Sequence, residues 1–187
     1  MPTRLVPITL ENVRAVAALE TAPHQRGLVA ENALTLAEAA LYGEIAVCRA
    51  VEHDGVLVGF VALALEEGKP PWIWRLMVDH RRQGEGLGRA AVALAIELAR
   101  ELRPEAREIR LSHVVRAYDP GPFYERLGFT YTGEVDDDGE RVMRLPLSPR
   151  GSPRRGGCRR SRACCSTPRS GTRSRRRRGG WCARSPR

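Results

Sequence analysis

The feature that most constrains this chain is a glycine-rich loop, residues 82–90, between two hydrophobic segments. An apolar run at 72–78 leads into the loop, and a segment with helical spacing at 87–102 follows it. Because glycine has no Cβ atom, the three glycines of the loop let the backbone approach a ligand closely. The free N–H groups and the dipole at a helix start favour an anion there. The order of strand, glycine loop and helix therefore predicts a phosphate-binding turn.

Two familiar phosphate-binding motifs fit this loop poorly. Residues 86–91 satisfy the Gly-x-Gly-x-x-Ala pattern of dinucleotide-binding folds, but residues 79–83 separate that pattern from the strand. The acid expected about 20 residues further on should end the next strand, whereas Glu108 begins it. A Walker loop is excluded because the loop contains no Gly-Lys-Ser or Gly-Lys-Thr.

The composition changes abruptly after Leu147. Residues 148–187 contain 14 Arg and no Asp or Glu, whereas residues 1–147 contain 17 Lys or Arg and 22 Asp or Glu. The second part also lacks Leu, Ile, Val, Phe and Met, so it cannot bury enough apolar surface to offset the entropy of ordering. We expect a folded domain over 1–147 and a disordered basic tail over 148–187.

The tail has two interpretations. An arginine run at 175–178 is typical of a nucleic-acid-binding arm, although Trp181 is the single aromatic available for base stacking. The Arg/Ser/Gly/Pro/Cys bias is also that of a GC-rich gene read in another frame, and we favour this incidental origin. The tail cysteines have neither a Cys-x-x-Cys pair nor a histidine beside them, so no metal is expected.

The domain carries the marks of a cytoplasmic protein. Cys48 is its one cysteine, so it has no disulfide framework. The start of the chain lacks the apolar stretch of a signal peptide, and no run of about 18 apolar residues predicts a membrane span. We expect a cytoplasmic location and no membrane partner.

Hydrophobic spacing predicts an α/β (α+β) fold with a mixed sheet. The pattern indicates about seven strands, mostly antiparallel with a central parallel pair, and about four helices. The expected strands are 3–8, 45–52, 56–65, 72–78, 109–114, 129–135 and 141–147, and the expected helices are 10–20, 31–41, 87–102 and 123–127. Asp54-Gly55 predicts a hairpin. Helix 87–102 connects strands 72–78 and 109–114 as a crossover, so these two strands should form the parallel pair beside the glycine loop.

A second motif supports a specific phosphate ligand. The pattern Gln-x-x-Gly-x-Gly at 83–88 is followed by Phe-Tyr-Glu-Arg-Leu-Gly-Phe at 123–129. Together they resemble the GNAT acyltransferase superfamily, and the resemblance covers nearly all of 3–147. Four shorter stretches are similar to the bacterial spermine/spermidine N-acetyltransferase group: 27–32, 36–39, 75–81 and 133–136.

The resemblance implies that acetyl-CoA is the co-substrate. Backbone N–H groups over 83–89 would hold its pyrophosphate, and the strand edge at Met77 and Val78 would pair with the pantetheine amides. One N–H of that edge would polarise the thioester carbonyl. Arg82 and Arg89 would add charge, or else are ordinary solvated cations. The implied binding set is Met77, Val78, Arg82, Gln83, Gly84, Gly86, Leu87, Gly88 and Arg89.

The resemblance implies that Tyr124 is the catalytic acid, since the tyrosine at the equivalent position in the family protonates the leaving CoA thiolate. A phenol and a thiol have pKa values of roughly 10 and 8.5, so this transfer is feasible; a core aromatic is the alternative. The attacking amine must also lose a proton. Asp79 stands nearest to the acyl group among the candidate bases, although an ordinary strand-end acid fits equally well. The other candidates are Glu66, Glu67 and His80.

The acceptor is the least constrained part of the prediction. Glu31 and Glu38 would supply negative charge for a polyamine, or else are surface charges of a helix. One departure from the family pattern is the absence of Asn in 116–122, where Asp119 can replace it as an acceptor. We expect direct transfer of acetyl from acetyl-CoA to a small amine or polyamine. The alternatives are a protein lysine or N-terminus, an aminoglycoside-like amine, or non-catalytic binding of CoA or nucleic acid; a homodimer stays open.

Overall fold

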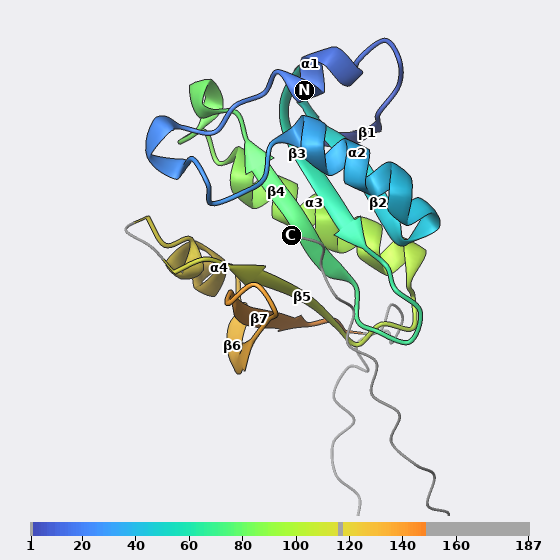
Figure 1. Cartoon of the computed structure of the whole chain (residues 1–187), viewed down its shortest axis with the longest axis vertical. Helices are drawn as coiled ribbons and strands as arrows, with labels where there is room; N and C mark the ends of the chain where they lie inside the picture. The colour runs from blue at the N-terminus through green and yellow to red at the C-terminus, as the bar shows by residue number, and fades with distance from the viewer. Residues whose placement is uncertain (1, 116–117, 149–187) are drawn as a thin grey trace, which may run out of the picture. The chain divides into compact units, whose positions relative to one another are not determined.

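The computed structural model describes residues 2–115 and 118–148, which form a seven-stranded mixed sheet with helices on both faces (Figure 1). The strands are β1 (Arg4–Pro7), β2 (Ala46–His53), β3 (Val56–Ala64), β4 (Trp72–Val78), β5 (Glu108–His113), β6 (Thr130–Val135) and β7 (Arg141–Pro146). The α-helices are α1 (Val13–Ala17), α2 (Asn32–Tyr42), α3 (Leu87–Leu102) and α4 (Gly121–Arg126). Three 3-10 turns accompany them: η1 (Pro23–Gln25), η2 (Gly43–Ile45) and η3 (His80–Arg82).

The sheet order is β1-β2-β3-β4-β5-β7-β6, and β4–β5 is the one parallel pair among its neighbours. The predicted fold class, a mostly antiparallel sheet with a central parallel pair, is therefore confirmed. The predicted basic tail lies outside the described residues from residue 149 onward, and it stays a prediction.

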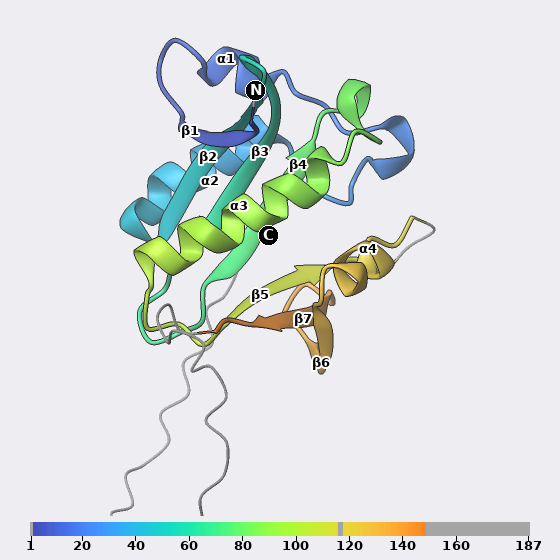
Figure 2. The same ribbon diagram turned by 180° about the vertical axis from the view of Figure 1, so that it is seen from behind.

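Strand β3 separates two apolar clusters because successive side chains of a strand point to opposite faces. Phe60 and Ala62 belong to the cluster that contains Val16 of α1 and Met77. Val61, with Leu63, belongs to the cluster beneath α3. Helix α3 crosses the face shown in Figure 2, and α2 lies on the opposite face.

Helix α3 has the predicted bounds, and its buried face explains why it packs closely on the sheet. Leu87, Ala91, Ala95 and Ala99 recur every four residues along that face and are buried. Alanine side chains keep the helix close to the strands, which fixes the position of its first turn. No helix in the described part of the chain is long and apolar enough to cross a membrane.

The first helix is shorter than predicted, because a distant side chain captures the backbone that would continue it. The expected helix 10–20 forms only over Val13–Ala17. Beyond it, Glu20 N–H donates to Asp79 Oδ2 at 3.2 Å, and the Glu20 carbonyl accepts from the backbone N–H of His80 at 2.9 Å. These bonds tie the segment after α1 to the end of β4.

The parallel pair β4–β5 is very short. Only Trp72 and Ile73 of β4 pair with β5, opposite Arg110 and Leu111. Beyond these residues the two strands diverge, as both views of the sheet show (Figures 1 and 2). The second half of β4 therefore has a neighbour on one side only, and the glycine loop follows directly from this half.

Candidate active site

The backbone of β4 alternates between β3 and the opening toward β5. Asp79 N–H donates to the Val58 carbonyl at 2.8 Å, while Val78 lies opposite Gly59. Because bonded and non-bonded pairs alternate in antiparallel strands, Met77 directs its N–H and C=O toward β3 and Val78 directs them away. In agreement, a Cβ atom on Gly59 would lie 2.6 Å from the Met77 carbonyl oxygen.

The same alternation places Leu76 beside Val78 on the open edge, where the described part of β5 offers no partner. The carbonyl of Val78 accepts from Gln83 Nε2 at 3.0 Å, which leaves the Val78 N–H and both backbone groups of Leu76 facing the opening. An extended chain that contains amides can pair with such an edge. The edge residue that partners Val78 is thus Leu76 rather than Met77, whose side chain is buried in the core.

The glycine loop exposes the first turn of α3. Gly84 and Gly86 have φ angles of 85° and 79°, in the left-handed region that glycine adopts without strain. Gly86 is the N-cap residue, and no side chain caps the helix. The first hydrogen bond of the helix is donated by Ala90 N–H to the Gly86 carbonyl at 3.2 Å. The N–H groups of residues 87–89 therefore have no acceptor within the helix. This turn can bind an anion such as a pyrophosphate.

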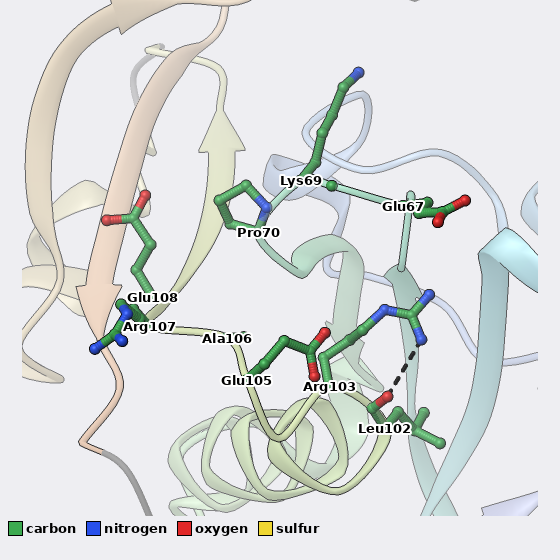
Figure 3. A pocket seen from close by; sticks show the side chains of 10 residues that line it. Glu67, Lys69, Pro70, Leu102, Arg103, Glu105, Ala106, Arg107 and Glu108 are labelled. Carbon is green, nitrogen blue, oxygen red and sulfur yellow. Dashed lines mark hydrogen bonds between the residues drawn. The ribbon is translucent and has the colours of Figure 1, made fainter. Parts of the chain in front are cut away.

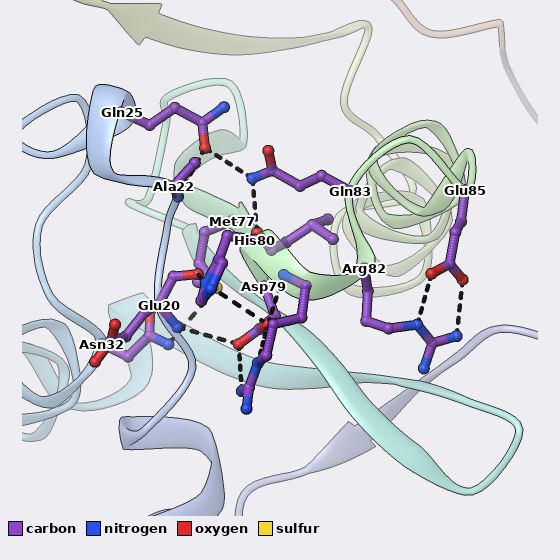
Figure 4. Close-up of polar contacts among 12 residues, drawn as sticks. Glu20, Ala22, Gln25, Asn32, Met77, Asp79, His80, Arg82, Gln83 and Glu85 are labelled. Atoms are coloured by element: carbon purple, nitrogen blue, oxygen red, sulfur yellow. Dashed lines mark hydrogen bonds and ion pairs between the residues drawn. The ribbon is translucent and has the colours of Figure 1, made fainter.

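Gln83 fixes the loop rather than facing a ligand with its side chain. Its Nε2 donates to Gln25 Oε1 of η1 at 2.7 Å as well as to the Val78 carbonyl (Figure 4). One amide therefore joins three segments: the end of β4, the loop and η1.

The two predicted cations of the loop differ in their surroundings. Arg82 donates from Nε and Nη2 to the two carboxylate oxygens of Glu85, each at 2.8 Å (Figure 4). These hydrogen bonds hold the pKa of Glu85 below its ordinary value, so the pair is ionised and its charges compensate. Arg89 is exposed on the first turn of α3 and has no ion pair within the described residues.

Asp79 is a buried structural clamp. Its carboxylate accepts from the N–H, Nε and Nη2 of Arg81 at 3.0, 2.7 and 2.8 Å, and from Glu20 N–H. The hydrogen bonds from Arg81 hold the pKa of Asp79 well below its ordinary value. A general base needs a free lone pair and a pKa nearer to neutrality, so this environment suits a tether.

The remaining candidate bases lie at opposite ends of the sheet. Glu66 pairs with Lys69 at 2.7 Å in the β3–β4 turn, and Glu67 lines a charged hollow beside the C-terminal end of α3 (Figure 3). A helix of 16 residues is about 24 Å long, so this hollow is far from the glycine loop. His80 comes two residues after the end of β4, where its Nδ1 lies 3.3 Å from the Glu20 carbonyl oxygen, and its side chain is 39% exposed.

Tyr124 lies next to the start of α3. Its neighbour Phe123 packs on Gly88, where an added Cβ atom would lie 3.4 Å from Phe123 Cζ. The Tyr124 ring centroid is 5.1 Å from that of Phe123 and 5.8 Å from that of Phe129. Burial raises the pKa of Tyr124 to about 12, so the phenol keeps its proton at neutral pH and acts as a donor. The fold thus brings the glycine loop and the tyrosine helix together.

The two predicted acceptor residues occupy different environments on α2. Glu31 is exposed at the N-cap position. Glu38 is partly buried, and its Oε2 is a buried atom without a hydrogen-bond partner in the part of the chain that the structure describes. Such an oxygen can receive a cation. Within residues 2–115 and 118–148, no three His, Cys, Asp or Glu side chains gather as metal ligands.

Sequence reasoning missed one polar group beside Tyr124. His113, at the end of β5, contacts Asp119 and Tyr131. The sequence did contain a signal for this group. Buried and partly exposed residues alternate along β5, and His113 falls on the buried side, where a polar side chain needs a partner.

Comparison with known proteins agrees with this geometry. Residues 11–129 match the model of the Acetyltransferase (GNAT) family, a span that includes both the glycine loop and α4. The chain belongs to this family. The matched span contains β4, the glycine loop, α3 and α4, so these elements are parts of one GNAT domain.

The chain is similar to one curated relative over part of its length and to two solved structures in fold. The spermine/spermidine N(1)-acetyltransferase of Bacillus subtilis strain 168 is 35% identical over 98 residues, which cover 49% of this chain and 64% of the relative. The PaiA N-acetyltransferase of Thermoplasma acidophilum, solved with coenzyme A, has a TM-score of 0.59 at 18% identity and covers 79% of this chain and 100% of its own. The ribosomal-protein-S18-alanine N-acetyltransferase of Escherichia coli has a TM-score of 0.58 at 21% identity, covering 80% and 97%. At these identities the two structures establish the fold alone.

Proposed function

We propose that this chain is an N-acetyltransferase that moves the acetyl group of acetyl-CoA directly to a primary amine. One observation carries the proposal: the open edge of β4, the uncapped first turn of α3 and the partly buried Tyr124 border the same end of the sheet. These are the three parts that an acyl-CoA transfer requires, namely an edge for amides, donors for a pyrophosphate and an acid for the leaving sulfur.

The residues present fit acetyl-CoA, which supplies an acetyl group activated as a thioester. The N–H groups of residues 87–89 bind the pyrophosphate, with Arg89 as an additional cation. Leu76 and Val78 pair with the amides of the pantetheine arm, and a free N–H on this edge stabilises negative charge on the thioester oxygen. Gly84 and Gly86 keep the approach to the loop open.

Tyr124 donates the proton that the sulfur gains when the carbon–sulfur bond breaks and the carbon–nitrogen bond forms. An amine that enters as an ammonium first gives up one proton to solvent, and its nitrogen loses a second proton as the amide forms, which balances the proton that the sulfur gains. We assign this second proton to His80, directly or through water, because His80 is the candidate base that is exposed at this end of the sheet. Asp79 contributes by holding the end of β4 in place.

The acceptor that we propose is a small cationic amine, a polyamine in particular. The buried, unpartnered Oε2 of Glu38 supports a cationic group near α2. The Bacillus subtilis relative, which is named as a spermine/spermidine N(1)-acetyltransferase, supports the same acceptor class, and the match covers 64% of that protein.

The test is release of CoA thiol from acetyl-CoA with a panel of amines: spermidine, spermine, a monoamine, an aminoglycoside and a peptide with a free lysine. We expect the polyamines to give the highest kcat/KM, and Tyr124→Phe to lower kcat about hundredfold with acetyl-CoA binding unchanged. Preference for the peptide or the aminoglycoside would redirect the acceptor assignment. Absence of turnover with every amine, despite CoA binding, would overturn the enzymatic proposal.

A further inference from the structure

Three polar side chains form a contiguous series beside α4 that the proposed reaction does not use. His113 Nδ1 lies 3.1 Å from Asp119 Oδ1, and His113 Nε2 lies 3.1 Å from the Tyr131 hydroxyl. The His113 side chain is only 4% exposed, and its Nδ1 also lies 3.4 Å from the Val114 carbonyl oxygen, so both ring nitrogens have polar partners inside the protein. Such a buried and fully paired group holds its surroundings in one arrangement.

The acceptors around Nδ1 assign the imidazole tautomer. The Val114 carbonyl oxygen lies 3.4 Å from Nδ1 and a carboxylate oxygen of Asp119 lies 3.1 Å from it, and both can only accept, so Nδ1 carries the proton. Nε2 then accepts from the Tyr131 O–H. The three groups thus form one directed series from the phenol of Tyr131 to the carboxylate of Asp119.

This series is attached to the start of α4. Asp119 Oδ1 also accepts from Gly121 N–H at 2.8 Å, and Gly121 is the first residue of the helix. A Cβ atom on Gly121 would collide with the Tyr131 hydroxyl and lie 3.1 Å from His113 Cε1. The first turn of α4 therefore rests directly on the three side chains, and only glycine fits there.

Tyr124 follows Gly121 by three residues, which is about one helical turn. Its ring centroid lies 6.4 Å from that of His113. The Tyr124 hydroxyl has no hydrogen-bond partner within residues 2–115 and 118–148, and α4 has six residues, too few to hold its position alone. The placement of the phenol consequently depends on how the first turn is held.

We propose that His113, Asp119 and Tyr131 are positioning residues for Tyr124, which fix the first turn of α4 so that the phenol meets the leaving sulfur. This inference rests on the proposed acid role of Tyr124. It gives the three residues an effect on kcat, whereas binding of acetyl-CoA at the glycine loop is independent of them.

The first variant is Tyr131→Phe, which removes the hydroxyl and keeps the ring on which the Arg141 guanidinium packs at 3.8 Å. We expect kcat to fall about fivefold, the effect of one lost hydrogen bond, with the Kd of CoA unchanged. Tyr42→Phe is the matched control, because it removes a hydroxyl from an exposed tyrosine whose ring packs on Trp74. An unchanged kcat in Tyr131→Phe would overturn the proposal.

A double-mutant cycle separates positioning from general stability. His113→Asn keeps a donor near Nδ1 but loses the contact with Tyr131, and we expect kcat to fall by up to about hundredfold. In the Tyr124→Phe background, Tyr131→Phe and His113→Asn should lower kcat no further. Effects that multiply in that background would overturn the positioning role, whereas full activity of Tyr124→Phe alone would instead overturn the acid role of Tyr124.

Discussion

The two ends of β4 differ in how their backbone groups are satisfied. At Trp72 and Ile73 the strand has neighbours on both sides, and the hollow next to this end is lined by charged side chains such as Glu67 and Arg103. At Leu76 and Val78 the strand has β3 on one side and an opening on the other. Unpaired backbone groups inside a sheet are costly unless a partner reaches them. The closed end therefore serves the fold, and the open end is the one suited to a ligand.

The substitution with the largest expected effect, Gly59→Ala, tests which side of β4 is paired with β3. Gly59→Ala places a Cβ atom 2.6 Å from the Met77 carbonyl, so β3 and β4 must separate at the open end. We expect the free energy of unfolding to fall by about 3 kcal/mol in urea titrations. A neutral substitution would mean that the Met77 carbonyl faces the opening, which would reverse the assignment of the edge.

The stability of the protein at alkaline pH tests the raised pKa of the Tyr124 phenol at the open end. Burial raises the pKa of Tyr124 from 10.0 to about 12, so the unfolded chain ionises first and stability is lost as pH rises from about 10 to about 12. This loss amounts to about 3 kcal/mol and should be absent from Tyr124→Phe. Identical alkaline slopes for the two proteins would contradict the raised pKa of this phenol.

Asp79→Asn distinguishes a clamp from a base. Loss of the buried carboxylate should lower the free energy of unfolding at pH 7 by about 2 kcal/mol, because the N–H of Glu20 and the donors of Arg81 lose their ionised acceptor. Since the pKa of Asp79 lies below its ordinary 3.8, this contribution is present above pH about 4 and disappears as the pH falls. If Asp79 is a clamp, kcat of the folded variant should be nearly unchanged. If Asp79 is the general base, its substitution should lower kcat about hundredfold or more.

Matched glycine substitutions compare the two ends directly. Gly86, at the open end, and Gly68, in the turn at the closed end, have φ angles of 79° and 74°, and neither has an atom within 4 Å of an added Cβ. Each substitution to alanine should cost about 1 kcal/mol of backbone strain. Only Gly86→Ala should also raise the KM for acetyl-CoA, by about tenfold, because its Cβ enters the approach to the loop. Equal KM values in the two variants would remove the glycine loop from CoA binding.

Local patterns predicted the elements, whereas contacts between distant segments decided the details of the site. The bounds of β4 and α3 follow from their apolar spacing, and Asp54-Gly55 forms the expected hairpin turn with both residues at positive φ. The register between β4 and β3 decides which residues of β4 direct their backbone groups toward the opening. This register places Leu76, rather than Met77, on the open edge. No residue of β4 specifies that register by itself.

The same limit applies to the surroundings of the predicted site residues. Arg81, two residues away, donates three of the four hydrogen bonds to Asp79, but the bond from Glu20 N–H spans 59 positions. His113 meets Tyr131 only because β5 and β6 both pair with β7. The pairing of Arg82 with Glu85 is different, since a separation of three residues makes it accessible to local reasoning. Long-range pairing, more than propensity, determined which acids and bases are free.

The compensation of Arg82 by Glu85 has a consequence for how the loop responds to ionic strength. Attraction by mobile surface cations is screened within about 10 Å at 0.1 M salt. With the charge of Arg82 compensated by Glu85, the loop holds its anion by peptide N–H groups in direct contact, which dissolved ions screen little, and by the exposed cation Arg89. The affinity of this GNAT domain for CoA should accordingly fall only weakly with rising salt, and Arg89→Gln should remove most of that dependence.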